Sequence, residues 1–109
     1  MSMKFFCKVR YNDSFYVLPP QQQGQLLMTL AAFTDKYVKA GKISDVYIVG
    51  DGKEAMFMWN VASNEEWLRV IYENPMRPWA NFEIAPVLEW EVAQKLMKER
   101  VENLQKSAK

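Results

Sequence analysis

The chain has 109 residues, half of them hydrophobic, and a formal net charge of +1 at pH 7. This length favours a single domain with a real core, which we expect to span residues 1–109. The basic residues form no stripe and no run approaches the ~20 apolar residues of a membrane span, so we expect neither a nucleic-acid nor a membrane partner. The sequence has no histidine and one cysteine, which excludes a Ser-His-Asp triad and argues against a zinc or haem site.

The cysteine, Cys7, lies in an alternating apolar segment and indicates a reduced protein without disulfides. We interpret it as a small buried hydrophobic residue rather than as a nucleophile. The N-terminal segment does not have the shape of a signal peptide, because Lys4, Lys8 and Arg10 interrupt its apolar residues. We therefore predict a cytoplasmic protein without a metal or cofactor, in which Glu, Asp, Lys or Tyr side chains would carry any acid–base chemistry.

The first two predicted elements are a strand and a long helix. Apolar and polar residues alternate from 3 to 11, which predicts the strand. A loop follows over residues 12–20, and Pro20 suits the first turn of a helix. From 21 to 40 the apolar residues recur on one helical face, and Gly41 fits the C-terminal cap of that helix.

A β-hairpin is predicted next. Residues 43–50 are rich in strand formers, and residues 54–61 form the returning strand. Between them, Asp51-Gly52 is a strong signal for a two-residue turn.

The last three predicted elements are a helix, a strand and a terminal helix. Ser63 and Glu66 have the spacing of a capping box, so a helix should begin there and end before Pro75. Residues 82–90 form the fourth strand. A C-terminal helical extension covers residues 91–109, supported by opposite charges four residues apart.

The order of these elements predicts an α+β fold. A βαββαβ sequence is the ferredoxin-like pattern, with an antiparallel four-stranded sheet in which the first strand lies between the third and the fourth. A C-terminal helix is added to it here. Two helices cover one face of such a sheet, so the other face needs either solvent-tolerant residues or a partner.

The alternation of the strands predicts which residues lie on each face. The more apolar set should meet the helices: Phe5, Cys7, Val9, Ala55, Phe57, Trp59, Val61, Phe82, Ile84 and Leu88. The opposite side, which we name the open face, should carry Phe6, Lys8, Arg10, Met56, Met58, Asn60, Glu83, Ala85 and Val87. This second set mixes large apolar groups with a few charges, the composition expected of a ligand cavity.

Two open faces packed together would enclose a barrel-like cavity, and burial of their apolar surface at roughly 25 cal/mol per Å² would favour a homodimer or a higher homo-oligomer. Lys8 or Arg10 would then lie near Glu83, whose buried carboxylate needs a partner. A register shift of one residue would exchange the two faces. The alternative is an ordinary exposed sheet with extended lysine side chains and a solvated glutamate.

Three stretches are similar to one known family: MKFFCKV (3–9), with a lysine at the position of Lys8, WNVASNEEWLRVI (59–71), and NPMRPWANFEI (74–84), with a glutamate at the position of Glu83. On these stretches the chain resembles the dimeric α/β-barrel superfamily, and within it the muconolactone-isomerase-like proteins. The resemblance implies ferredoxin-like subunits that pair through their sheets. It also implies an isomerase that shifts a double bond in an unsaturated lactone bearing a carboxylate.

The chain departs from that family at Arg77, where an apolar residue is usual, and at Phe6, where a histidine can occur. Any histidine-dependent step of the family therefore does not transfer to this chain. The terminal helix is also longer than the family pattern. The resemblance extends to uncharacterised members of the superfamily, which widens the functional range.

The leading hypothesis is a small-molecule isomerase that needs a base and a stabiliser for the developing enolate. Glu83 is the candidate base or proton shuttle. Lys8 would bind the substrate carboxylate or stabilise the oxyanion, with Arg10 as a second candidate. The residues that would shape the substrate site are Phe6, Tyr47, Met56, Met58 and Trp79. For Tyr47 and Trp79, a plain packing role fits better than contact with a substrate.

Three other functions remain open. A binding protein that sequesters or delivers a hydrophobic acid would need only Lys8 or Arg10 as an anchor. A cofactor-free oxygenase or aromatic cyclase would use the same cavity. In a purely structural role, Glu83 and Lys8 would form an internal ion pair.

The C-terminal helix carries a partial apolar stripe. It consists of Val92, Leu96, Val101 and Leu104. Such an arm either wraps a neighbouring subunit or is a solvated tail that frays.

Overall fold

The computed structural model describes residues 3–107. Residues 1–2, and residues 108–109 of the predicted extension, lie outside the described residues. Within this range the elements are β1 (Met3–Tyr11), α1 (Asp13–Tyr16), α2 (Pro20–Lys39), β2 (Ile43–Ile48), β3 (Glu54–Val61), α3 (Asn64–Glu73), the 3₁₀ turn η1 (Arg77–Trp79), β4 (Ala80–Val87) and α4 (Trp90–Ser107).

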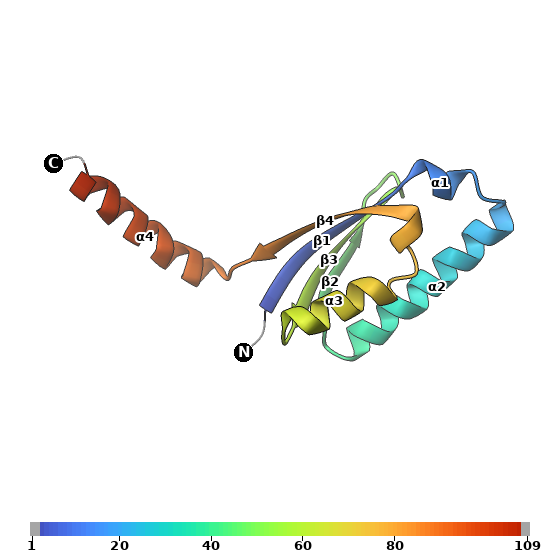
Figure 1. Ribbon diagram of the computed structural model, residues 1–109, viewed down its shortest axis with the longest axis horizontal. Coiled ribbons are helices and arrows are strands. Elements are labelled where there is room, and N and C mark those ends of the chain that lie inside the picture. Colours follow the sequence, from blue (N-terminus) through green and yellow to red (C-terminus); the bar gives the residue numbers. More distant parts are fainter. Residues whose placement is uncertain (1–2, 108–109) are drawn as a thin grey trace.

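The sheet is antiparallel with the strand order β2-β3-β1-β4, so that β1 lies between β3 and β4. Helices α2 and α3 lie on one face of this sheet, and α4 follows β4 away from both layers (Figure 1). The predicted α+β class, the four-stranded antiparallel sheet and the C-terminal helix are confirmed. The arrangement is compatible with a ferredoxin-like fold.

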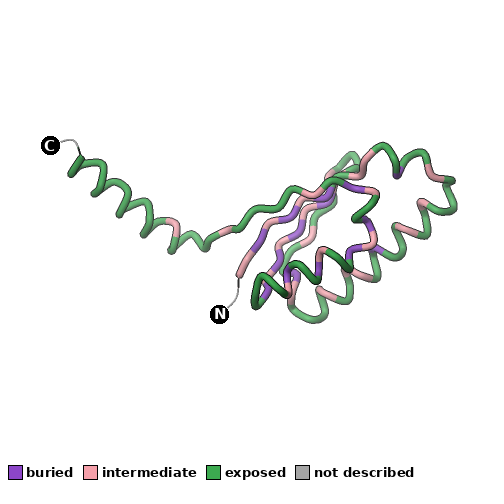
Figure 2. The backbone as a smooth tube through the Cα atoms, in the orientation of Figure 1, coloured by how far each residue is buried: buried purple, intermediate pink, exposed green. Residues whose placement is uncertain are grey.

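The core lies between the sheet and its two helices (Figure 2). As predicted, the inward residues of the two central strands are all buried: Phe5, Cys7, Val9, Ala55, Phe57, Trp59 and Val61. Trp59 is the centre of an aromatic cluster, with its ring 5.3 Å from that of Tyr37 and 5.6 Å from that of Trp67. The Trp67 ring in turn stacks on Phe5 at 4.8 Å. Helix α3 is thereby anchored to β1 and β3 through aromatic rings.

The fourth strand differs from its prediction at both ends, since it covers Ala80–Val87 rather than 82–90. It begins early because Ala80 already pairs with Tyr11 of β1 as the chain leaves η1. Two residues expected to be covered are not, because Ile84 is 39% exposed and Leu88, beyond the strand, is 61% exposed. The cause is the position of β4 at the sheet edge, since α2 and α3 contact β2 and β3.

Two connections were predicted incompletely. The predicted hairpin between β2 and β3 is present, but the prediction of a two-residue turn is wrong, because β2 ends at Ile48 and β3 begins at Glu54. Gly52 has φ of 73° within the loop, and its N–H donates to the Val49 carbonyl at 2.8 Å. Inside the predicted loop 12–20, a single helical turn forms over Asp13–Tyr16.

Helix α3 begins and ends where local signals place it. The Glu66 N–H donates to Ser63 Oγ at 3.1 Å, as a capping box requires. The reciprocal bond runs from the Ala62 N–H to Glu66 Oε1 at 3.4 Å, one residue before the expected donor. A hydrogen bond from Lys42 lowers the pKa of the Glu66 carboxyl. The helix ends at Glu73, before Pro75, as predicted.

Helix α4 has no buried residue and makes the molecule long, with extents of 65 × 28 × 24 Å. In Figure 2 it is exposed over nearly its whole length. Among residues 3–107, no helix combines the length and the apolar character needed to cross a lipid bilayer.

Cys7 is buried on the helix side of β1, and this burial raises the pKa of its thiol to about 11. We predict that a thiol reagent at pH 8 modifies the native chain far more slowly than the chain in denaturant. An unfolded cysteine ionises at about pH 8.5. The buried, protonated thiol therefore costs no stability below that pH, and the free energy of unfolding falls as the pH rises from there towards 11. Urea unfolding at pH 7.5 and 10.5 should show the loss, and Cys7→Ala should remove it. Rapid labelling of the native chain would contradict the prediction.

Candidate functional site

The strand register brings four of the proposed site residues into one row across the open face. Lys8 on β1 lies opposite Met56 of β3 on one side and opposite Glu83 of β4 on the other. Met56 in turn lies opposite Tyr47 of β2. Neighbouring strands are about 4.8 Å apart, so the row from Tyr47 to Glu83 spans about 14 Å.

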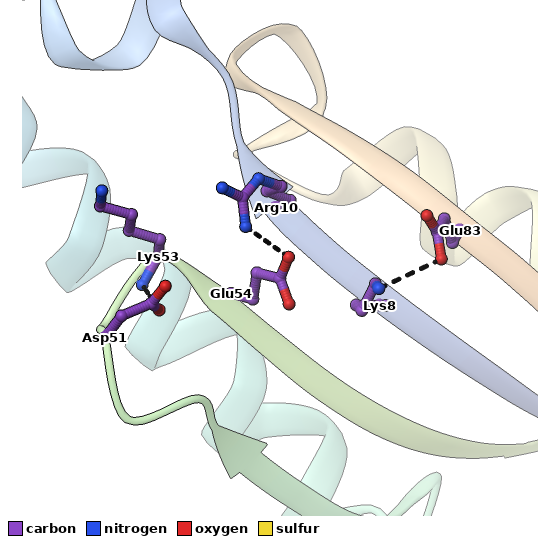
Figure 3. A network of polar contacts seen from close by, with 6 residues as sticks. All are labelled: Lys8, Arg10, Asp51, Lys53, Glu54 and Glu83. Carbon is purple, nitrogen blue, oxygen red and sulfur yellow. Dashed lines mark hydrogen bonds and ion pairs between the residues drawn. The ribbon is translucent and has the colours of Figure 1, made fainter.

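Lys8 and Glu83 form an ion pair at the β4 end of this row. Their side chains point toward one another from β1 and β4 (Figure 3), and Lys8 Nζ lies 3.4 Å from Glu83 Oε2. The side chain of Lys8 is 30% exposed and that of Glu83 is 73% exposed. A pair this open to water contributes at most about 1 kcal/mol to stability. The pair can therefore separate at little cost when a ligand competes for either partner.

Arg10, the second candidate anchor, already has a carboxylate partner. Its Nη1 lies 2.5 Å from Glu54 Oε1 at the start of β3 (Figure 3). This hydrogen bond, and then the charge of Glu54, raise the pKa of the Arg10 guanidinium further. Arg10 is therefore held at the end of the open face, and Lys8 is the cation at its centre.

The second row of the open face is apolar on β3, β1 and β4. Phe6 lies opposite Met58 on one side and opposite Ala85 on the other, and both Phe6 and Met58 are half-buried. The ion pair thus has apolar neighbours on two strands. Asn60 is on the same face, and among the described residues its buried Oδ1 has no hydrogen-bond partner.

Two of the proposed site residues lie differently from the rest. Tyr47 is on the open face but is 61% exposed on the edge strand β2. Trp79 belongs to η1 and packs against the buried core, so the structure does not bring it to the row of Lys8 and Glu83. For Trp79 the packing role that the sequence left open is the one observed.

Three charged residues of this face were not proposed as site residues from the sequence. Glu54 pairs with Arg10, Asp45 lies opposite Met58 after a register shift in β2, and Lys4 pairs with Glu89. The sequence did not indicate the Arg10–Glu54 pair, because the partner of Arg10 depends on how β1 and β3 align.

One groove of the structure lies on the other side of the sheet. It has a volume of about 280 Å³ and is lined by residues of α2, β1, β2 and β3. It holds none of the proposed site residues. Within residues 3–107, no three acidic or cysteine side chains gather as a metal site would require.

A comparison of the sequence with protein-family models and with curated proteins gives no match. The fold and the site define a small α+β protein with an ion pair on a partly apolar sheet face that its own helices leave uncovered. The function must therefore be argued from the chemistry of that face.

Proposed function

We propose that this protein is a small-molecule isomerase that resembles muconolactone isomerase and moves a double bond in an unsaturated lactone or cyclic acid by proton transfer. The observation that carries the proposal is the Lys8–Glu83 pair, with 3.4 Å between Nζ and Oε2, beside half-buried Met56 on the open face. It combines a carboxylate that can accept a proton with a cation that can stabilise an anion.

The active form is a homodimer in which two open faces enclose the site as a dimeric α/β barrel. A single chain leaves the Glu83 side chain 73% exposed, whereas a general base of this kind works best away from bulk water. A second copy would exclude water from both sheets. The half-buried side chains of Phe6, Met56 and Met58 supply apolar surface for that contact.

In this reaction Glu83 acts first as the base and then as the acid, and the product has the same atoms as the substrate. The Glu83 carboxylate removes a proton from a carbon next to the substrate carbonyl, and the bond electrons move to the carbonyl oxygen as an enolate. The Lys8 ammonium stabilises that oxygen or holds the substrate carboxylate. The Glu83 carboxyl then returns the proton to a different carbon, and the carbonyl re-forms with the double bond shifted.

A second candidate is a binding protein for a hydrophobic acid. The weak, water-exposed pairing of Lys8 with Glu83 favours it, because Lys8 can exchange one carboxylate for another without chemistry. The same apolar face would hold the rest of such a ligand.

The test is incubation of the full chain in D₂O with unsaturated five-membered lactones that bear a carboxylate, followed by NMR. Isomerisation with deuterium on the carbon that regains the proton is expected. A ligand that binds and is recovered unchanged, without deuterium, would favour the binding protein instead. Oxygen consumption with phenolic compounds would point to a cofactor-free oxygenase.

A further inference from the structure

An apolar strip on the helix side of β4 has no helix over it. From Phe82 onward, every second residue of β4 faces the side on which α2 and α3 lie, because its partners on β1 are buried there. Ile84 is nevertheless 39% exposed, and Leu88, just after the strand, is 61% exposed. Pro86 between them is exposed as well. The layer formed by the two helices therefore ends before it covers β4.

The flank of α3 next to this strip is also apolar and exposed. Glu73 accepts a hydrogen bond from Tyr37, so its flank of α3 faces α2. Leu68 and Tyr72, four residues apart, share the flank turned away from α2. The guanidinium of Arg77, in the turn that leads into β4, lies 4.4 Å from the centre of the Tyr72 ring. Leu68 is 48% exposed and Tyr72 is 59% exposed. We name the combined area the β4–α3 surface; it consists of Ile84, Pro86, Leu88, Leu68 and Tyr72.

Helix α4 carries apolar residues over about half of its circumference. Val92 and Leu96 form one patch, about 120° round the helix from a longer stripe. No residue of α4 is buried. An isolated helix of 18 residues is only marginally stable in water, so α4 needs a surface that covers both patches. The residues of the stripe are spaced by three or four: Trp90, Ala93, Met97, Val101 and Leu104.

The two patches of α4 match the two parts of the β4–α3 surface. A helix laid on β4 has the sheet on one side and α3 beside it. If it begins at the Leu88 end of β4 with the stripe on the strand, its right-handed winding turns Val92 and Leu96 toward α3. Lys95 and Glu102 then face water. The lengths also agree, because the 18 residues of α4 and the 8 residues of β4 each span about 27 Å.

The α4 helix of the same chain leaves in the other direction. In Figure 1 it points away from α2 and α3 and bends upward, whereas α3 lies below β4. The Ala93 N–H already donates to the Glu89 carbonyl at 3.0 Å, and the Glu89 carboxylate pairs with Lys4 of β1. Docking on its own β4 would need a complete reversal of the chain at residues 88–89, directly after the fixed backbone of Pro86.

We propose that α4 of one copy docks on the β4–α3 surface of a second copy, and that two copies exchange these helices reciprocally. A two-fold axis near residues 88–89, in the plane of the sheet and at right angles to the strands, generates this pair. It sets the two sheets end to end with their helix layers on opposite sides. Each α4 then continues from its own β4 over the helix side of the partner's β4, entering at the Leu88 end.

The contact is large enough for a stable pair. A docked helix is about 27 Å long and about 10 Å wide, so two of them bury on the order of 1,600 Å² in total, the area of a typical specific interface. The open face lies on the other side of the sheet and takes no part. The inference therefore does not rest on the proposed function.

The first experiment compares matched variants of the full chain by sedimentation equilibrium, all in a Met58→Glu background that disrupts the open face. Val101→Glu places a charge on the stripe, and Lys95→Glu places the same side chain on the water-facing side of α4. Leu68→Lys places a charge on the α3 flank, and Arg69→Lys keeps one on the side toward α2. We expect Val101→Glu and Leu68→Lys to raise the dimer Kd about tenfold for each docked helix, and so about a hundredfold in total. The two controls should leave the Kd unchanged, and an unchanged Kd in all four would contradict helix exchange.

A second measurement distinguishes the partner's helix from the chain's own. Chains with Leu68→Cys are mixed at low concentration with chains carrying Leu96→Cys, concentrated and treated with a short bis-maleimide, to which buried Cys7 does not respond. Exchange predicts a cross-linked pair that contains one chain of each kind, whereas Arg69→Cys with Lys95→Cys should not give it. A chain that carries both Leu68→Cys and Leu96→Cys, and that cross-links only within itself as a monomer, would overturn exchange.

The Met58→Glu background also separates this inference from the proposed function. Met58→Glu chains that still dimerise, and that Val101→Glu then dissociates, would support helix exchange whether or not the open faces pair. Met58→Glu chains that are monomeric, from a native chain that is dimeric, would overturn helix exchange and leave the pairing of open faces standing. A native chain that stays monomeric at millimolar concentration would contradict both.

Discussion

Replacing Glu83 with glutamine should lower the kcat of the isomerisation by two to four orders of magnitude, the usual contribution of a general base. Glutamine keeps the size and the hydrogen-bonding reach of glutamate but cannot accept the substrate proton. It also removes the charge that pairs with Lys8 at 3.4 Å, so substrate affinity should be kept or improved. The measurement is kcat and KM on the substrate found in the D₂O experiment.

Glu89→Gln is the matched control. Glu89 also pairs with a lysine of β1, Lys4, but it lies beyond the end of β4 and outside the row of site residues. Its replacement should change kcat by no more than a few-fold. If Glu83→Gln retains turnover to the same extent, Glu83 is not the base. If the joint replacement Lys8→Met with Glu83→Leu leaves ligand binding unchanged, the pair is structural.

Replacing Trp59 with alanine should destabilise the chain by about 3–5 kcal/mol. The side chain is 3% exposed, and its ring is within 6.5 Å of four others: Phe33, Tyr37, Phe57 and Trp67. Its removal leaves a cavity where β3 meets both α2 and α3. A small domain has a total stability of only about 5–15 kcal/mol. The midpoint of urea unfolding should therefore fall steeply, and a fraction of the chain should be unfolded without urea.

Trp90→Ala is the control for this prediction. It deletes the same side chain from a position that is 65% exposed on α4. In protein dilute enough to be monomeric, we expect a change below about 0.5 kcal/mol. Equal losses for Trp59 and Trp90 would contradict the description of the core.

Elements defined by neighbouring residues could be predicted from the sequence. Strands β1 and β3 have the predicted limits, because their alternation is regular and both lie inside the sheet. The Ser63 cap and Pro75 act on backbone groups only a few residues away, so the limits of α3 also follow. Gly41 has φ of 74°, as the cap of α2 requires.

Features that depend on distant contacts could not be predicted in the same way. The limits of β4 follow from its pairing with β1 after η1, which no local pattern shows. Ile84 looks like a core residue in the chain, but it lies at a sheet edge that the helices do not cover. The loop after Ile48 is longer than the two-residue turn that Asp51-Gly52 indicates, because the Asp51 carboxylate accepts a hydrogen bond from the Lys53 N–H at 2.9 Å and holds a wider turn.

The candidate site, too, could be predicted only in part. Alternation and topology were sufficient to place Lys8 and Glu83 on one face, because the side chains of a strand alternate strictly. The residue opposite each of them depends on register, and the sequence left open a shift of one position. The structure brings Lys8 and Glu83 directly opposite each other, and the same register gives Arg10 its partner Glu54. Whether these residues act on a substrate stays a prediction.

The two outer strands of the sheet disfavour its lateral growth, so the proposed pairing through the open face would stop at two copies. An unpaired strand edge is a template for further strands and for fibrils. In β2 a register shift between Ile43 and Asp45 interrupts the regular spacing of free backbone groups. In β4, Pro86 lacks the N–H that an added strand would need. Lateral growth is disfavoured at both edges, so the face can be apolar without leading the chain to aggregate.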